Sequence, residues 1–187
     1  MNVINQIKSQ IIFILMSNGK KIERFYLNLT SLNNLIKSNY NSPELKIILE
    51  RNEEINFYKF LYKEIGKDFF WRDRLKWSED QWFNYIDKIK FYVLRKKDEI
   101  LGFYELLHDQ TNNLTEITYL GIFNNYYNKG IGGYLLTDAI IRAFEKPINY
   151  VSVHTCTLDH PNALKNYIAR GMKIYKKEEI YYNPENF

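Results

Sequence analysis

The stretch "NKGIGGYLL", Asn128 to Leu136, places three glycines within four residues, immediately before an apolar run. Glycine destabilises a helix by about 1 kcal/mol relative to alanine, so the cluster needs another explanation. Backbone N–H groups point outward at the start of a helix, where the macrodipole adds about half a positive charge. Glycines let a ligand approach this backbone closely. The segment predicts a phosphate-binding loop or, alternatively, a tight turn that packs a helix closely on a strand.

Two common phosphate-binding motifs do not match this loop. A Walker motif ends in Gly-Lys-Ser/Thr, whereas here Lys129 precedes Gly130. A dinucleotide motif needs a third glycine, and Leu135 occupies that position. Kinase-like and dehydrogenase chemistry are therefore not supported.

Two segments resemble the acetyl-CoA-binding motifs of the GCN5-related N-acetyltransferase (GNAT) family. The first, "YLGIFNNYYNKGIGGYLL", matches a strand, a splayed end and Arg/Gln-x-x-Gly-x-Gly/Ala at the start of a helix. The second, "HPNALKNYIARGM", resembles the next helix of the family. Tyr127 stands where the family usually has arginine or glutamine. The resemblance extends from Leu45 to Tyr182 in element order and from Leu114 to Met172 in motif detail.

This resemblance implies an α/β fold whose central mixed sheet is splayed at the acetyl-CoA site and flanked by helices. It also implies an acetyl-CoA-dependent N-acetyltransferase, in which a primary amine attacks the thioester directly. The backbone at Leu120 and Ile122 is expected to bind the pantetheine arm. The other residues expected to bind acetyl-CoA are Tyr127, Asn128, Lys129, Gly130, Ile131, Gly132, Gly133, Asn162 and Tyr167.

Such a reaction requires a base, an oxyanion donor and an acid for the leaving thiolate. Tyr167 is the expected acid, with a core tyrosine on an apolar helix stripe as the alternative. Glu116 is the expected base, directly or through water, because a period of two places it on the same face as Leu120. The alternative is a solvated or ion-paired glutamate. His154 is the next candidate for the base.

The acceptor side of the site is less clear from the sequence. The segment "FFWRDRLKWSEDQW", residues 69–82, fits either an acceptor wall or a core segment with a helix cap. The acceptor is a small-molecule amine or a protein or peptide amine. Because Tyr127 departs from the motif, the alternative function is a non-catalytic CoA-binding or regulatory module.

Composition indicates one globular domain over residues 21–187, preceded by an extension over residues 1–20 of unclear structure. The chain has 187 residues, of which 45% are hydrophobic and 26% charged. Its net charge of +4 invites a nucleic-acid hypothesis, but the lysines alternate with acids, as in Lys176 to Glu179. We expect no nucleic-acid partner and a monomer or homodimer.

The single cysteine, Cys156, excludes an internal disulfide framework, indicates a reducing compartment and is read as a buried packing residue. The longest apolar run, Ile11 to Met16, is far shorter than the ~20 residues of a membrane span. We therefore expect a cytoplasmic protein without a membrane partner. The three histidines, His108, His154 and His160, lack paired ligand spacing, so no metal is expected.

The hydrophobic pattern predicts antiparallel hairpins on both sides of a parallel β-α-β centre. Expected strands are residues 21–29, 44–50, 91–95, 100–108, 114–123 and 149–156. Expected helices are residues 56–65, 78–88, 131–145 and 160–171, and residues 172–183 are expected to form a final hairpin.

Overall fold

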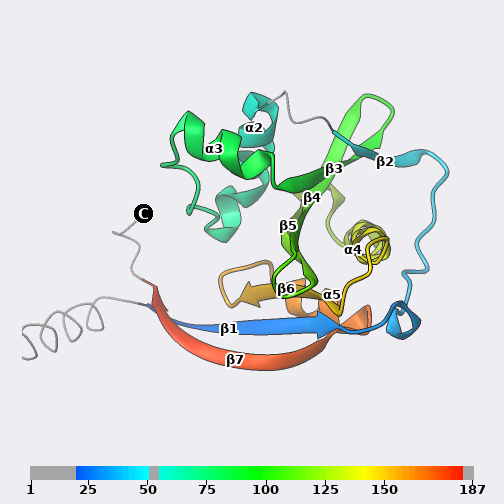
Figure 1. Cartoon of the computed structure of the whole chain (residues 1–187). Helices are drawn as coiled ribbons and strands as arrows, with labels where there is room; N and C mark the ends of the chain where they lie inside the picture. The colour runs from blue at the N-terminus through cyan, green and yellow to red at the C-terminus, as the bar shows by residue number, and fades with distance from the viewer. Residues whose placement is uncertain (1–19, 51–54, 183–187) are drawn as a thin grey trace, which may run out of the picture.

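The fold is a seven-stranded mixed sheet with helices on both faces (Figure 1). The computed structural model describes residues 20–50 and 55–182. The strands are β1 (Lys20–Leu29), β2 (Leu45–Leu49), β3 (Ile89–Lys96), β4 (Glu99–Asp109), β5 (Leu114–Ile122), β6 (Tyr150–Cys156) and β7 (Lys173–Tyr182). The helices are α2 (Ile55–Gly66), α3 (Glu79–Ile86), α4 (Ile131–Ala143) and α5 (Ala163–Ala169), with 3-10 turns η1 (Leu32–Asn34), η2 (Lys67–Phe69) and η3 (Asn124–Tyr126). The predicted mixed α/β class is confirmed.

The strand order is β2-β3-β4-β5-β6-β1-β7. Strands β2 to β5 pair antiparallel, and β5 pairs parallel with β6 after the crossover through α4. The predicted parallel centre with antiparallel pairs before it is therefore confirmed. Parallel strands require such a crossover connection, and the apolar α4 covers the sheet as it returns.

The N-terminal strand β1 lies between β6 and β7, and it pairs antiparallel with both. The predicted C-terminal hairpin is wrong, because β7 is a single strand along β1. Its charged run looked like a turn, but the charges have partners across the strands. Lys21 Nζ lies 2.8 Å from Glu179, and Lys177 Nζ lies 2.6 Å from Glu23. The predicted extension falls on residues 1–20, of which 1–19 lie outside the described residues.

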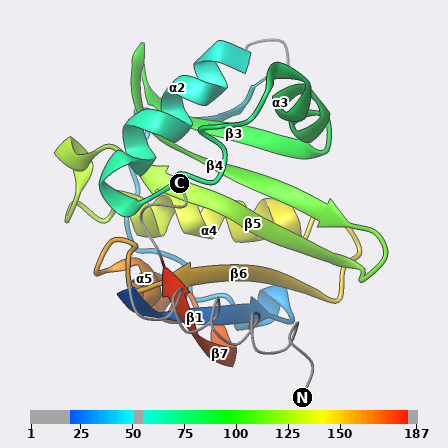
Figure 2. The ribbon, with the colours of Figure 1, turned by 90° about the vertical axis from the view of Figure 1, so that its left-hand side faces the viewer.

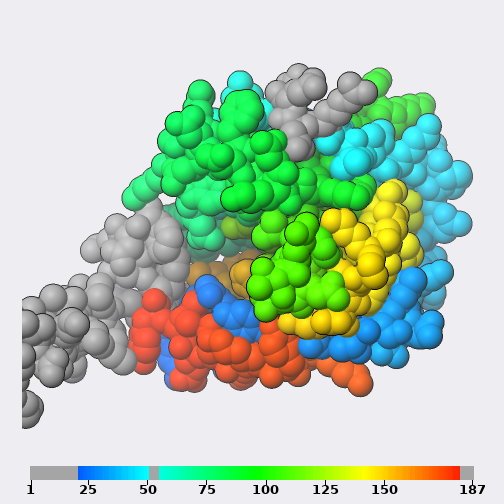
Figure 3. Space-filling view, viewed as in Figure 1, coloured from blue at the N-terminus to red at the C-terminus, as the bar shows by residue number. Residues whose placement is uncertain are grey.

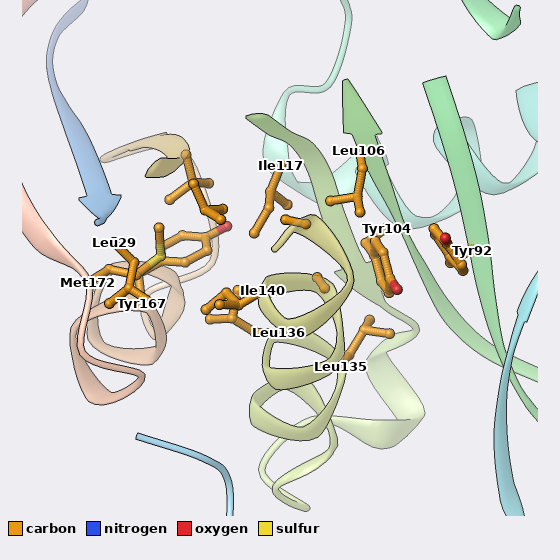
Figure 4. Close-up of a cluster of buried hydrophobic side chains, with 14 of the residues drawn as sticks. Leu29, Tyr92, Tyr104, Leu106, Ile117, Leu135, Leu136, Ile140, Tyr167 and Met172 are labelled. Atoms are coloured by element: carbon orange, nitrogen blue, oxygen red, sulfur yellow. The ribbon is translucent and has the colours of Figure 1, made fainter. Parts of the chain in front are cut away.

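Two hydrophobic clusters hold the helices on opposite faces of the sheet (Figure 2). Helices α4 and α5 cover one face, where Leu135, Leu136 and Ile140 are fully buried (Figure 4). Helices α2 and α3 cover the other face. As predicted, α3 begins at a cap: the Ser78 hydroxyl accepts from the Gln81 N–H, and the Gln81 side chain accepts from the Ser78 N–H.

A β-bulge at Thr118 divides β5 into two parts of different register. Glu105 of β4 lies opposite Tyr119, while Leu106 lies opposite Ile117, so Thr118 is the additional residue. Ile117 and Leu120 consequently both pack in the cluster under α4, although they are three residues apart. A regular strand would keep Glu116 on the face of Leu120. That prediction is wrong, because the bulge reverses the alternation between them.

A buried ion pair anchors the bulge. Arg74 is 5% exposed and Glu105 is fully buried, and Arg74 Nη1 donates to both carboxylate oxygens at 3.2 and 3.1 Å. The hydroxyls of Tyr85 and Thr118 donate to Glu105 Oε2 at 2.7 and 2.9 Å. The carboxylate therefore ties the bulge residue to the segment that follows α2.

We expect Glu105→Gln to lower the free energy of unfolding by roughly 3–5 kcal/mol, because Arg74 would remain charged and buried without a counter-ion. Urea denaturation measures this loss. Glu50→Gln is the control, since Glu50 pairs with Arg95 at 2.8 Å with both side chains 25% exposed, and it should cost clearly less. Equal small losses for the two variants would show that Arg74 does not depend on Glu105.

Candidate active site

A cleft opens where β5 and β6 separate. The two strands are paired over Leu114–Glu116 and Tyr150–Ser152, and beyond these residues they diverge (Figure 2). The cleft has a volume of about 360 Å³. It is lined by the diverging strands, the glycine loop, α5 and the segment after α2. Strand edges without a neighbour can bond an extended ligand through their backbone groups.

Most of the residues expected to bind acetyl-CoA meet at this cleft. Those that line it are Leu120, Ile122, Tyr127, Asn128, Gly130, Gly132, Gly133, Asn162 and Tyr167. The side chains of Lys129 and Ile131 do not line it. Ile131 is 4% exposed in the core, and Lys129 Nζ donates to the Asn125 carbonyl at 2.8 Å. Neither side chain therefore contributes to the lining of the cleft.

The three glycines of the loop differ in their backbone conformation and in their surroundings. Gly130 caps α4 with φ +77°, a left-handed conformation that favours glycine. A Cβ on Gly133 would lie 2.4 Å from Arg170 Nη1, at the far end of a flexible side chain, so a side chain there would displace the guanidinium. A Cβ on Gly132 would meet nothing closer than 3.8 Å. Gly132 is therefore required by neither conformation nor packing, and it leaves free space at the helix N-terminus.

Helix α5 lies beside the glycine loop and bonds to it. Asn162 Nδ2 donates to Asn128 Oδ1 at 3.4 Å, and Asn166 Nδ2 donates to the Gly132 carbonyl at 3.2 Å. The sequence interpretation missed Asn166, although its spacing of four from Asn162 places both on one helix face. These bonds fix the position of the loop relative to the cleft.

Tyr167 lies at the base of the cleft. It is 7% exposed, and its ring lies beside Met172 with the hydroxyl pointing toward β5 (Figure 4). Among the described residues its hydroxyl has no hydrogen-bond partner. Burial, and secondly the charge of Asp159, raises the pKa of this hydroxyl well above that of an ordinary tyrosine. The side chain is thus both a core residue and a protonated group facing the cleft.

Glu116 and His154 form a pair across β5 and β6. Glu116 Oε1 lies 3.2 Å from His154 Nδ1. His154 lines the cleft, whereas Glu116 lines a separate depression with Tyr26 and Ser152. Glu116 therefore does not line the cleft itself but contacts His154, a residue that does. The pairing was not predictable from the sequence, because it depends on the alignment of two strands that are far apart along the chain.

The aromatic segment after α2 is divided between the cleft and the core. Phe69, Phe70 and Trp71 line the cleft together with the Asp73 carboxylate. Trp82 is 3% exposed in the core between α2, α3 and the sheet. The space-filling view shows the recess between the α3 side and the β7 side of the molecule (Figure 3).

Cys156 and Asp159 also line the cleft. Cys156 is half-buried rather than fully buried as predicted, and burial raises the pKa of its thiol, so it is not an activated nucleophile. Asp159 Oδ2 accepts from Thr155 Oγ1 at 2.6 Å and from the Cys156 N–H at 3.0 Å, which closes the turn after β6.

Two observations apply only to the part of the chain that the structure describes. Over residues 20–50 and 55–182, no group of three or more histidine, cysteine, aspartate or glutamate side chains is arranged to hold a metal ion. None of the helices within these ranges is long and apolar enough to cross a membrane.

Solved structures with a similar fold include several acetyltransferases. A GCN5-related N-acetyltransferase from Sphaerobacter thermophilus matches with a TM-score of 0.65 and 11% identity, over 95% of this chain and 57% of that chain. An IAA acetyltransferase from Bacillus cereus matches with a TM-score of 0.54 and 23% identity, over 71% of this chain and 79% of that chain. An aminoglycoside acetyltransferase from an uncultured soil metagenomic sample matches with a TM-score of 0.55 and 20% identity, over 68% and 87%.

At these identities the matches show the fold alone. The chain spans 55% and 57% of the length of two structures that it matches along nearly its whole length. A comparison with curated proteins finds no match. The family model described as the Acetyltransferase (GNAT) family matches residues 53–172, which is more than half of the chain. With the fold, the diverging strands and the glycine loop in place, the chain belongs to the GNAT acetyltransferase family.

Proposed function

We propose that this protein is an acetyl-CoA-dependent N-acetyltransferase that acetylates a primary amine by direct transfer. One observation carries the proposal: a single cleft contains the glycine loop, the diverging strands and the buried Tyr167 hydroxyl. Each suits a different part of acetyl-CoA. The loop offers N–H groups to the pyrophosphate, the strand edge offers backbone groups to the pantetheine arm, and Tyr167 offers a proton to the sulfur.

The fit of the loop to a phosphate rests on Gly132. The space beside it is open, and it lies in the first turn of α4, where N–H groups have no partner within the helix. Leu120 and Ile122 follow the bulge on the strand edge that faces away from β4 and toward β6. We assign the pantetheine arm to this edge.

We assign the base to the pair of Glu116 and His154. His154 is one of the residues that line the cleft, and its Nδ1 faces Glu116, which leaves Nε2 as the atom that takes a proton. The amine nitrogen forms a bond to the carbonyl carbon, and the C–S bond breaks. The proton from the amine passes to His154, and the sulfur takes a proton from Tyr167, which regains one from solvent.

Tyr167→Phe is expected to lower turnover roughly 10- to 100-fold while acetyl-CoA affinity stays nearly unchanged, because the ring still packs and only the proton donor is lost. Since the pKa of the hydroxyl is raised, the wild-type rate should not fall through loss of this proton as the pH rises to 9. Steady-state kinetics and calorimetry measure the two effects. Wild-type turnover in the variant would exclude Tyr167 as the acid.

The second candidate is a CoA-binding module without turnover. It is favoured by Tyr127, which lacks the hydrogen-bonding side chain of the family motif and instead packs against His160 with ring centroids 4.7 Å apart. This alternative predicts binding of acetyl-CoA but no amine-dependent release of CoA.

Incubating the protein with acetyl-CoA, a thiol reagent and a panel of amines separates the two functions. The panel should contain amino acids, polyamines, arylalkylamines, lysine peptides and aminoglycosides, the last because one structural neighbour bears that name. We expect thiol release that depends on one amine class, with an equal amount of acetylated product. Binding without release for every class would favour the module, and no binding would contradict both.

A further inference from the structure

One face of helix α5 lies along the glycine loop. Asn162, Asn166 and Arg170 are spaced by four, which places them along one helix face. The two asparagines bond to Asn128 and Gly132, as described above. Arg170 continues the row, and its Nη1 lies 2.4 Å from the position that a Cβ on Gly133 would occupy. The guanidinium therefore lies against the first turn of α4.

Arg170 has no counter-ion within the part of the chain that the structure describes. Its Nε is buried without a hydrogen-bond partner, and no carboxylate pairs with the guanidinium. Burial lowers the pKa of the group, with no opposing contribution from an acid. By contrast, Arg74, Arg95 and Arg142 each have a carboxylate within 3.1 Å.

The Arg170 guanidinium lies beside the N-terminus of α4, where a positive charge without a counter-ion is especially unfavourable. The positive end of the α4 macrodipole lies at Gly130 to Gly133, and a cation there is unfavourable unless an anion joins it. A side chain at Gly133 would displace the guanidinium from this position. The fold thus brings two sources of positive potential together at the edge of a cleft that Gly133 and Asn166 line. This arrangement suits a bound phosphate.

We propose that Arg170 donates to a phosphate group of CoA and takes over the contact that the family motif makes from the position of Tyr127. The inference rests on the proposed function. Arginine suits the role because its fork of N–H donors matches phosphate oxygens and stays charged when partly buried. Tyr127 carries no charge, and its ring packs against His160 and Phe69.

Calorimetric titration of CoA and of 3′-dephospho-CoA tests the assignment. We expect Arg170→Gln to weaken CoA binding roughly tenfold or more, the typical value of one charged hydrogen bond. The matched control is Lys165→Gln, which removes an exposed cation from the same helix and should leave the affinity unchanged. If the variant loses affinity for CoA alone, the contact is to the 3′-phosphate. If it loses affinity for both ligands, the contact is to the pyrophosphate.

A purely structural role for Arg170 has a different signature. Arg170→Lys keeps the charge but not the packing against Gly133, so it should retain more affinity than Arg170→Gln if the phosphate contact is real. Equal losses in the two variants, or no loss in Arg170→Gln, would overturn the inference. In both cases the wild-type protein would still bind CoA and turn over, so the proposed function would be unaffected. Failure of the wild type to bind CoA would instead reject the proposed function itself.

Discussion

Gly132→Asp is expected to abolish acetyl-CoA binding while leaving the protein folded and at least as stable. A Cβ at this position would meet no protein atom closer than 3.8 Å, so the start of a side chain has free space there. An acid in the first turn stabilises a helix, and replacing glycine removes a helix-breaking residue. The same carboxylate would occupy the phosphate position with the wrong charge. We expect affinity to fall roughly 100-fold or more, about 2.7 kcal/mol.

The prediction is specific because affinity for acetyl-CoA should fall while the stability of the protein should not. Calorimetry measures affinity, and thermal denaturation without ligand measures stability. Gly132→Ala should give a smaller loss of affinity, because it adds bulk without charge. Gly102→Ala is the contrasting control, since its Cβ would lie 2.4 Å from the Gly121 carbonyl oxygen on the neighbouring strand and should cost stability. Wild-type affinity in a folded Gly132→Asp protein would show that phosphate binds elsewhere.

Glu116→Gln is expected to reduce turnover roughly 100-fold, the low end of the range for general acid–base catalysis. Glutamine keeps the size of the side chain but removes the carboxylate that lies 3.2 Å from His154 Nδ1. The acidic limb of the pH–rate profile should change in the variant. The defect should shrink as pH rises, because more of the amine is then neutral and needs less help from a base.

A double mutant tests whether the two residues act together. His154→Gln should be at least as impaired as Glu116→Gln, and the double variant no worse than His154→Gln, because both remove the same proton path. Glu179→Gln, in a surface pair with Lys21, is the control and should behave as wild type. Additive defects, or a wild-type profile for Glu116→Gln, would contradict the pair and leave Glu116 with a structural role.

Local patterns in the sequence were sufficient for most of the fold. The alternation along β1 and the capping pair of Ser78 and Gln81 depend on neighbouring residues, so these elements appear where predicted. The glycine spacing likewise led to the cleft. What glycine does at each position could not be predicted, because the free space at Gly132 and the close contact at Gly133 are set by α5.

The features that the sequence interpretation missed depend on contacts between distant segments. The bulge at Thr118 reverses the face of Glu116, and it is anchored by Glu105 on the neighbouring strand. The charges of β7 indicated a turn until their partners on β1 were known. The role of Arg170 likewise becomes visible only when α5 is placed against α4.

A crystal structure of the acetyl-CoA complex tests the proposed binding mode. We expect the pyrophosphate to lie against the N–H groups of Gly130 to Gly133 and the pantetheine arm to lie between β5 and β6. We also expect the thioester sulfur within hydrogen-bond distance of the Tyr167 hydroxyl and a phosphate oxygen within reach of Arg170. Acetyl-CoA bound outside this cleft, or with its sulfur far from Tyr167, would contradict the proposed mechanism.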